Sequence, residues 1–232
     1  MMLLEDRGKG LFREHGIEVP RGRRCTDPEE LRAADLPLVI KALVPVGGRG
    51  KAGGVSKVST PDEAVREATR ILSLEISGYR PQGVLAEEVL PVDREIYLAI
   101  AIDRSMGIPV LLAGAVGGVD VESIPSSAMG RWPIHPFLGV GEHLVRETSR
   151  SLSLRHVEAQ FGRTLRGLWN LFTKMDCELV EVNPLILTTD GRLVAADSKV
   201  VVNDDSLYRH PEIGSDLPVM DELEAEARGE RM

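Results

Sequence analysis

A glycine-rich segment early in the chain holds the residues whose types and spacing most clearly suggest chemistry. The run VGGRGKAGG, residues 46–54, contains Arg49 and Lys51 among its glycines. Glycines have no Cβ, so their backbone N–H groups can approach phosphate oxygens closely, and the two cations offset phosphate charge. The run is not a Walker A loop, because Lys51 is followed by Ala52, which has no hydroxyl for magnesium. It predicts a phosphate-binding loop, and composition alone leaves a plain glycine turn as the alternative.

Glu181, Asn183 and Asp197 form a second group of polar residues near the end of the chain. They bracket an expected β-hairpin with the turn Asp190-Gly191, so two acids and an amide can meet at one end of a sheet. Oxygen ligands of this kind suit Mg²⁺, which keeps several waters and is completed by substrate phosphates. Two acids on a hairpin are more often surface or capping residues, so the magnesium hypothesis depends on their combination with the glycine loop.

Three further charged residues interrupt apolar, strand-like runs. Lys41 lies within LVIKALV, residues 38–44, directly before the glycine loop, as suits a buried strand that carries a functional side chain. Glu87 and Glu95 lie in and beside apolar strands, where an unpaired carboxylate is unfavourable unless it is hydrogen-bonded. Ribose hydroxyls or an adenine amino group would supply a partner, and exposure on an edge strand is the alternative for each glutamate.

Helices and strands alternate in the part of the chain that must position these residues. Apolar residues at helical spacing predict a helix over residues 3–15, ended by Gly16, and another over residues 155–175. Cap, proline and acid patterns that begin at Asp27 and Thr60 predict helices to about residues 34 and 74. β-branched and alternating runs predict strands at 38–44, 55–58, 83–90, 95–103, 109–116, 178–188 and 193–197.

These elements predict an α+β fold with a helix-and-strand N-terminal lobe to about Leu74 and a sheet-rich remainder. The three runs between residues 83 and 116 are separated by short turns and suggest an antiparallel meander. Residues 120–150 contain several prolines and should be loop with one short helix. The acidic tail from Ile213 onward should be a surface helix or a frayed end.

Composition and charge narrow the functional classes. The net charge of −8 disfavours a nucleic-acid surface, and the basic run Arg21–Arg24 is expected to be a solvated turn. Cys25 and Cys177 form no metal-ligand spacing, so a reduced intracellular setting is favoured over a zinc site or a disulfide framework. The uncharged stretch 107–119 is shorter than the roughly 20 apolar residues of a membrane span. We therefore expect a cytoplasmic protein without nucleic-acid or membrane partners.

Taken in order, the motifs resemble the β subunit of succinyl-CoA synthetase, of the ADP-forming acyl-CoA synthetase family. The resemblance covers nearly the whole chain, and although each motif alone is modest, the ordered set is highly specific. It rests on the opening KGLFREHGIEVP, Lys41, GGRGKAGG, Glu87 and Glu95, Asp103-Arg104-Ser105, Gly117-Gly118-Val119, EVNPLILT, Asp197 and the closing Leu207-Tyr208-Arg209-His210-Pro211.

The resemblance implies an ATP-grasp fold, in which two α/β lobes clamp a nucleotide. Residues 1–212 would form this domain, with a subdomain break near residues 20–85, and residues 213–232 would be an acidic C-terminal tail or linker. The C-terminal CoA-ligase domain that is usual in the family would be absent.

The resemblance also implies roles for single residues. MgATP would be held at its phosphates by Lys41, Gly48, Arg49 and Gly50, with Glu87 and Glu95 on the base and ribose side and Asn183 and Asp197 as magnesium ligands. Glu181 would be the catalytic acid, near the point where a phosphohistidine docks for phosphoryl transfer. In this family ATP, CoA and a carboxylic acid interconvert with acyl-CoA, ADP and phosphate, through an acyl phosphate and that phosphohistidine.

The implied partners are a CoA-binding α-type subunit that carries the phosphohistidine and a separate chain that supplies the missing C-terminal domain. Within this chain no histidine is a convincing substitute, whether His15, His135, His143, His156 or His210. Val116 replaces the glutamate that usually precedes the Gly-Gly-Val triplet in the succinate type, which points to an altered substrate or partner contact.

Two other functions stay open. A regulatory or assembly module would keep the nucleotide clamp and perform no chemistry. A different ATP-grasp ligase would phosphorylate a small acid for capture by an amine, but the joint presence of GGRGKAGG and EVNP speaks against it. The sequence identifies neither the acyl acid nor a preference for ATP over GTP.

Overall fold

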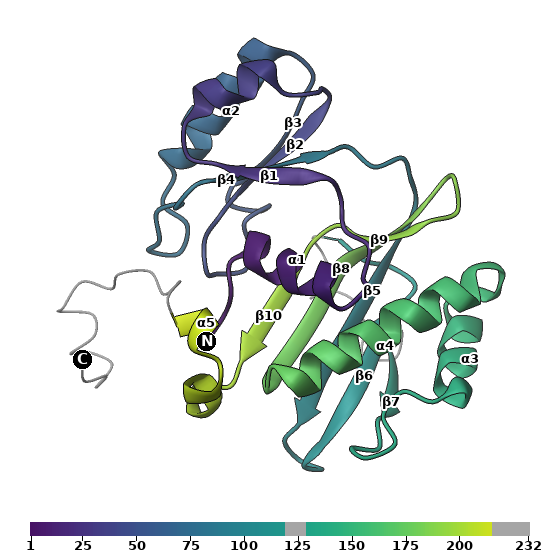
Figure 1. Cartoon of the computed structure of the whole chain (residues 1–232). Coiled ribbons are helices and arrows are strands. Elements are labelled where there is room, and N and C mark those ends of the chain that lie inside the picture. The colour runs from purple at the N-terminus through teal and green to yellow at the C-terminus, as the bar shows by residue number, and fades with distance from the viewer. Residues whose placement is uncertain (119–128, 215–232) are drawn as a thin grey trace.

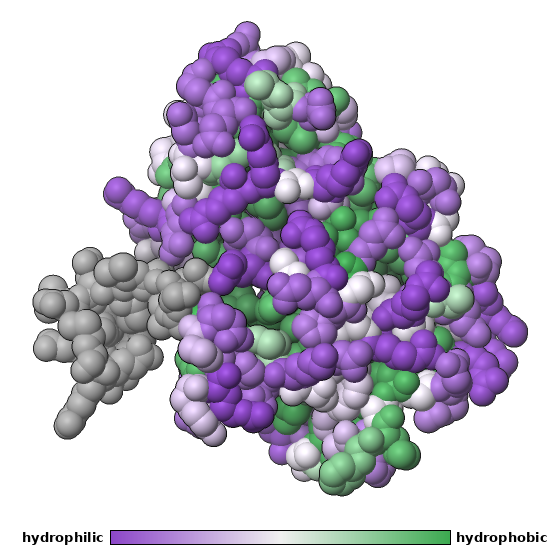
Figure 2. Space-filling model, in the orientation of Figure 1, coloured by the Kyte–Doolittle hydropathy of each residue, from purple (hydrophilic) through white to green (hydrophobic). Residues whose placement is uncertain are grey.

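The computed structural model describes residues 1–118 and 129–214, which form two lobes, each built on one antiparallel sheet (Figure 1). The smaller sheet lies above the larger one in this view, and the first helix of the chain lies between them. Figure 2 shows the molecule from the same side, and hydrophilic residues cover most of the surface visible there. Among the described residues, no helix combines the length and the apolar character needed to cross a membrane.

The small lobe packs one α-helix against a four-stranded sheet. Its elements are β1 (Gly22–Cys25), the 3₁₀ helix η1 (Pro28–Ala33), β2 (Leu38–Ala42), β3 (Val55–Val58), α2 (Pro61–Leu72) and β4 (Val84–Glu88), with the sheet order β1-β4-β2-β3. As predicted, α2 begins where Thr60 accepts a hydrogen bond from the Glu63 N–H, with Pro61 in the first turn. The buried face of α2 packs on β2, so this helix supports the strand that carries Lys41.

The large lobe contains the other described elements. These are α1 (Glu5–Glu14), β5 (Val92–Asp103), β6 (Ile108–Gly114), β7 (Gly130–Pro133), α3 (Glu142–Ser151), η4 (Arg155–Val157), α4 (Glu158–Lys174), β8 (Cys177–Thr188), β9 (Leu193–Ala195), β10 (Lys199–Val202), η5 (Asp204–Arg209) and α5 (Pro211–Gly214). The sheet order is β10-β8-β5-β6-β7, and β9 pairs with the other end of β8. Helix α4 buries Phe161, Leu165 and Leu168 and packs on β5 and β8. This core fixes the long strand that carries Glu181 and Asn183.

Helix α1 is first in the chain but joins the large lobe. The Leu3 N–H donates to the Val200 carbonyl over 2.9 Å, and Phe12 is fully buried in the same core as α4. Gly16 has φ +74, the left-handed conformation that ends the helix as predicted. The C-terminal end of α1 packs closely on α4 at Gly167, where an added Cβ would lie 2.6 Å from the carbonyl oxygen of His15, the residue that follows α1.

We expect Gly167→Ala to lower the free energy of unfolding by about 1–3 kcal/mol, because an added methyl group forces a well-packed contact apart. This loss outweighs the roughly 1 kcal/mol that alanine gains over glycine in a helix. Gly10→Ala on α1 is the matched control: nothing lies within 4 Å of its added Cβ, so it should be neutral or stabilising. Urea unfolding followed by circular dichroism measures both, and equal stability of the two variants would contradict the close contact.

Strand pairing differs from the sequence prediction in the first half of the chain. The meander expected over residues 83–116 is wrong, because β4 pairs with β2 in the small lobe and only β5 and β6 form a hairpin. The predicted end of the N-terminal lobe at about Leu74 is also wrong, because β4 belongs to the small lobe. Arg21–Arg24 is not a turn, since Gly22–Cys25 form the edge strand β1 alongside β4. A short apolar run carries no information about its partner strand, so local patterns cannot decide these pairings.

The second half of the chain follows the prediction more closely. The hairpin turn at Asp190-Gly191 is confirmed, with Gly191 at φ +83, and α3 matches the short helix expected between residues 120 and 150. The sequence analysis did not predict β7 or β10. Residues 119–128, which include Val119 of the Gly-Gly-Val triplet, and residues 215–232 of the expected acidic tail lie outside the described part of the chain.

Candidate functional site

A cavity of about 780 Å³ lies between the two lobes. Every residue that the sequence analysis proposed for the site borders it: Lys41, Gly48, Arg49, Gly50, Glu87, Glu95, Glu181, Asn183 and Asp197. These residues come from separate stretches of the sequence and from both sheets. The fold therefore brings together a set that the sequence only suggested.

The register of the large sheet places Glu181, Asn183 and Asp197 on one face. Strand β10 pairs Lys199 with Glu181, and β9 pairs with β8 in the same register. If the same register is extended across the link between β9 and β10, Asp197 lies opposite Asn183 of β8. Because residues two apart on a strand point to the same side, these side chains share the cavity face of the sheet.

The glycine loop follows β2 directly and is closed by its own backbone. The Gly54 N–H donates to the Arg49 carbonyl over 2.8 Å, and the Ala52 N–H donates to the Gly48 carbonyl over 3.1 Å. Gly48 has φ +76, a conformation that other residues rarely adopt. The loop is therefore a defined turn at the cavity, and it directs Arg49 toward the large lobe.

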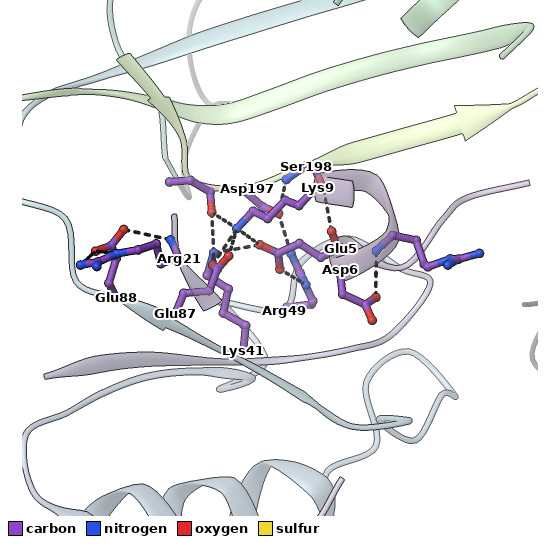
Figure 3. Close-up of polar contacts among 12 residues, drawn as sticks. Glu5, Asp6, Lys9, Arg21, Lys41, Arg49, Glu87, Glu88, Asp197 and Ser198 are labelled. Carbon is purple, nitrogen blue, oxygen red and sulfur yellow. Dashed lines mark hydrogen bonds and ion pairs between the residues drawn. The ribbon is translucent and has the colours of Figure 1, made fainter. Parts of the chain in front are cut away.

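A buried cluster of charged side chains joins the two lobes beside this cavity (Figure 3). We name it the ion cluster, and its members are Glu5, Lys9, Lys41, Arg49, Glu87 and Asp197. Glu5 and Lys9 come from α1, and the sequence analysis did not find them. Their only signal is that a Glu and a Lys one turn apart share a helix face with the buried Phe12.

Lys41 and Arg49 share the carboxylate of Glu5. Lys41 Nζ lies 2.8 Å from Glu5 Oε1, 2.8 Å from Glu87 Oε2 and 2.5 Å from the Ala196 carbonyl oxygen. Arg49 donates through one terminal nitrogen to Glu5 Oε2 over 2.5 Å and through the other to Asp197 Oδ1 over 2.8 Å. Ion pairs combined with hydrogen bonds in this way allow ions to remain buried.

Burial and neighbouring charges shift the pKa values of the cluster in opposite directions. Burial alone would raise the pKa of Glu5, but Lys41, Lys9 and Arg49 outweigh it and hold the pKa well below its usual range. Burial alone would lower the pKa of Lys41, but the carboxylates of Glu5, Glu87 and Asp197 outweigh it and raise the pKa. For Lys9, burial prevails and lowers the pKa. Glu5 and Lys41 are therefore both ionised near neutral pH.

The two glutamates predicted to face a base and ribose have different surroundings. Glu87 is 1% exposed, and its carboxylate contacts Lys9 and Lys41, so these ion pairs account for its burial without any ligand. Glu95 lies beside Gly118, where an added Cβ would come within 2.6 Å of Glu95 Oε2. The roles of both glutamates toward a nucleotide remain predictions.

Glu181 lies in the wall of the cavity among polar side chains. Tyr97 and Asn183 are polar neighbours of its carboxyl, and Lys199 is its cross-strand partner. Burial raises the pKa of its carboxyl, with Lys199 opposing the shift and Asp197 adding to it. Burial also raises the pKa of Tyr97, with a contribution from Glu181. A partly buried carboxyl in this position can bond to a group that enters the cavity.

Asn183 and Asp197 are the predicted magnesium ligands. The Asn183 amide oxygen accepts from the Gly118 N–H over 2.7 Å, and Asp197 Oδ1 accepts from Arg49 and from the Ser198 N–H. Within residues 1–118 and 129–214, no group of three or more His, Cys, Asp or Glu side chains could hold a metal ion. One carboxylate and one amide fit Mg²⁺ whose other positions are taken by water and phosphate oxygens.

The chain belongs to the ATP-grasp domain family, whose model matches residues 2–187. This membership confirms the predicted α+β fold with two lobes around the site. The sequence is 39% identical over 223 residues to the succinate–CoA ligase (ADP-forming) subunit beta of Desulfurococcus amylolyticus, and 38% identical over 236 residues to that of Ignicoccus hospitalis. The matches cover 92% and 98% of this chain but only 59% and 62% of the relatives. The resemblance noted in the sequence is confirmed, and the chain spans about three fifths of the length of these relatives.

Two solved structures share the fold of this chain. The dinucleotide forming acetyl-coenzyme A synthetase 1 of Ca. Korarchaeum cryptofilum matches with a TM-score of 0.73 at 18% identity, over 87% of this chain and 93% of that chain. The ATP citrate lyase of Methanothrix soehngenii matches with a TM-score of 0.62 at 20% identity, over 88% of this chain and 56% of that chain. At these identities the likeness concerns the fold alone.

Proposed function

We propose that this chain is the nucleotide-binding part of a cytoplasmic ADP-forming acid–CoA ligase of the succinyl-CoA synthetase type. It binds MgATP between its lobes and exchanges a phosphoryl group with a phosphohistidine on a CoA-binding α-type subunit. The names of the sequence relatives support this class of reaction. Because the chain covers 59% and 62% of those relatives, the complete reaction also requires the counterpart of the part of them that this chain does not match.

The observation that carries the proposal is the convergence of two kinds of phosphate-binding group on one cavity. Lys41, Arg49 and the loop N–H groups provide positive charge and donors suited to phosphate oxygens. Asn183 and Asp197 border the same cavity and provide oxygen ligands for Mg²⁺. A triphosphate with its magnesium ion needs both kinds of group, whereas an uncharged ligand would need neither.

Phosphoryl transfer needs positioning and charge stabilisation more than covalent chemistry from the protein. Lys41 and Arg49 would hold the oxygens of the transferred phosphate. Magnesium, when bound, would neutralise charge that develops on those oxygens. Glu181 would orient the incoming imidazole and stabilise its positive charge, because a carboxylate in the cavity wall favours a cation beside it.

Nucleotide binding by the purified chain is the direct test. At about 100 times its dissociation constant, ATP or ADP should stabilise the chain by about 2.7 kcal/mol, and a melting curve reads this as a higher melting temperature. The shift should be larger with Mg²⁺ than with EDTA, GTP in parallel measures the base preference, and adenosine is the control that lacks phosphates. A melting temperature that responds to no nucleotide, with or without the partner subunits, would overturn the proposal.

A nucleotide-binding regulatory or assembly module is the second candidate. It is favoured by one observation: the ammonium of Lys41 is already held by two carboxylates and a carbonyl oxygen of the protein. Such a module would bind nucleotide but transfer no phosphoryl group in any reconstituted complex. Transfer to the partner histidine by the wild-type complex would exclude it.

A further inference from the structure

The ammonium of Lys41 is held by three protein oxygens in the ion cluster. Lys41 Nζ donates to Glu5 Oε1 over 2.8 Å and to the Ala196 carbonyl oxygen over 2.5 Å, and it forms an ion pair with Glu87 Oε2 over 2.8 Å. A phosphate that binds Lys41 therefore competes with these contacts. Glu5 and Glu87 are 2% and 1% exposed, and a buried carboxylate that loses its cation is strongly destabilised. Another cation must remain with them when Lys41 moves.

Lys9 duplicates the contacts of Lys41 from a position that the cavity does not reach. Lys9 Nζ lies 2.8 Å from Glu5 Oε1, 2.6 Å from both carboxylate oxygens of Glu87 and 2.7 Å from the Ala196 carbonyl oxygen. It is fully buried, and unlike Lys41 it does not border the cavity. Figure 3 shows its ammonium among the same carboxylates that bind Lys41.

We propose that Lys9 is a positioning residue, which stays with Glu5 and Glu87 as their counter-ion when Lys41 turns to the phosphates of a bound nucleotide. This inference rests on the proposed function. The ion cluster has three cations and three carboxylates, so it is electrically balanced before a ligand enters. After the exchange, Lys9 still pairs with both glutamates and Arg49 still pairs with Glu5. No buried carboxylate is then left without a cation.

Lys9→Met tests the proposal, because methionine fills a similar volume without charge. Glu87 is then left with Lys41 as its only cation, whereas Glu5 keeps Arg49, so Lys41 resists transfer to the phosphates. We expect the dissociation constant for MgATP to rise at least ~10-fold, which is about 1.4 kcal/mol. Isothermal titration calorimetry below the melting temperature measures the constant, and its stoichiometry reports the folded fraction. Lys174→Met, an exposed lysine in the last turn of α4, is the matched control and should leave the constant unchanged.

A second substitution separates this role from simple support of the fold. Adding Glu87→Gln to Lys9→Met removes the carboxylate whose only remaining cation is Lys41, so most of the lost affinity should return. A purely structural role predicts lower melting temperatures in both variants with wild-type affinity in the folded fraction, and that result would overturn the inference. Failure of the double variant to recover affinity would also overturn it. If the wild-type chain binds no MgATP, the proposed function fails first, so the two failures are distinguishable.

A crystal structure of the wild-type chain with Mg²⁺ and a non-hydrolysable ATP analogue answers the question even if Lys9→Met does not fold. We expect Lys41 Nζ on a phosphate oxygen with at least one protein contact exchanged, and Lys9 Nζ still bonded to Glu5 and Glu87. Two results would refute the counter-ion role: a structure in which Lys9 is separated from both glutamates, or one in which Lys41 keeps all three of its protein contacts.

Discussion

Glu181→Gln should lower the rate of phosphoryl transfer by roughly 10²–10⁴-fold while leaving MgATP affinity unchanged, the range expected when a positioned ionisable side chain is lost. The amide keeps the shape and one oxygen acceptor of the carboxyl but cannot stabilise the positive charge of an incoming histidine. Its neighbours Tyr97 and Asn183 can still hydrogen-bond to it, so the cavity wall should keep its structure. Single-turnover transfer of phosphate from labelled ATP to the partner subunit, in a complex reconstituted with the α-type subunit, gives the rate.

Glu178→Gln is the matched control for this experiment. Glu178 lies on the same strand but its side chain is 45% exposed beside Arg104, so its loss should change neither binding nor transfer. If Glu181→Gln transfers phosphate at the wild-type rate, the catalytic role proposed for Glu181 is wrong. If the wild-type complex binds nucleotide but transfers nothing, the regulatory or assembly module becomes the better description of the chain.

Asp197→Asn should remove the magnesium-dependent part of nucleotide binding. The asparagine keeps the size of the side chain and an oxygen for Arg49, but it lacks the charge that draws Mg²⁺ to the cavity. In the wild type, MgATP at about 100 times its dissociation constant adds about 2.7 kcal/mol of stability. In the variant, we expect the melting temperature with ATP to be the same in Mg²⁺ as in EDTA. The difference between the two melts is the readout, so a change in stability without ligand does not disturb it.

Asp205→Asn removes the same charge from an exposed position in η5 and should keep the full magnesium-dependent shift. A full shift in Asp197→Asn as well would show that Mg²⁺ is held elsewhere. Loss of the entire nucleotide response in Asp197→Asn, in EDTA as well as in Mg²⁺, would instead point to a disrupted ion cluster, because Arg49 binds both Asp197 and Glu5.

The proposed site residues could be named from the sequence because each belongs to a motif with a recognisable local pattern. Lys41 stands out as a cation in an apolar strand, the glycine loop by its composition, and Asn183 and Asp197 by their place around a hairpin. The structure brings all of them to one cavity. For Glu87 the sequence leaves two alternatives open, a ligand as partner or exposure on an edge strand, whereas the structure shows it buried against Lys9 and Lys41.

Three local features of this protein follow from short stretches of sequence: the capped start of α2 at Thr60, the end of α1 at Gly16 and the Asp190-Gly191 hairpin. These features depend on backbone preferences and hydrogen bonds within a few residues, so a short window contains the information. Two other features, the pairing of β4 with β2 and the packing of α1 on the large lobe, are seen only in the folded chain.

Those two long-range choices create the ion cluster. Lys9 and Glu87 are 78 positions apart, and Lys41 and the Ala196 carbonyl are 155 positions apart. The way in which distant segments meet decides whether a charged side chain is buried and which opposite charge lies beside it. Those neighbours in turn set the free energy of the buried charge. No local pattern contains that information, so the partners of Lys41 became visible only in the folded chain.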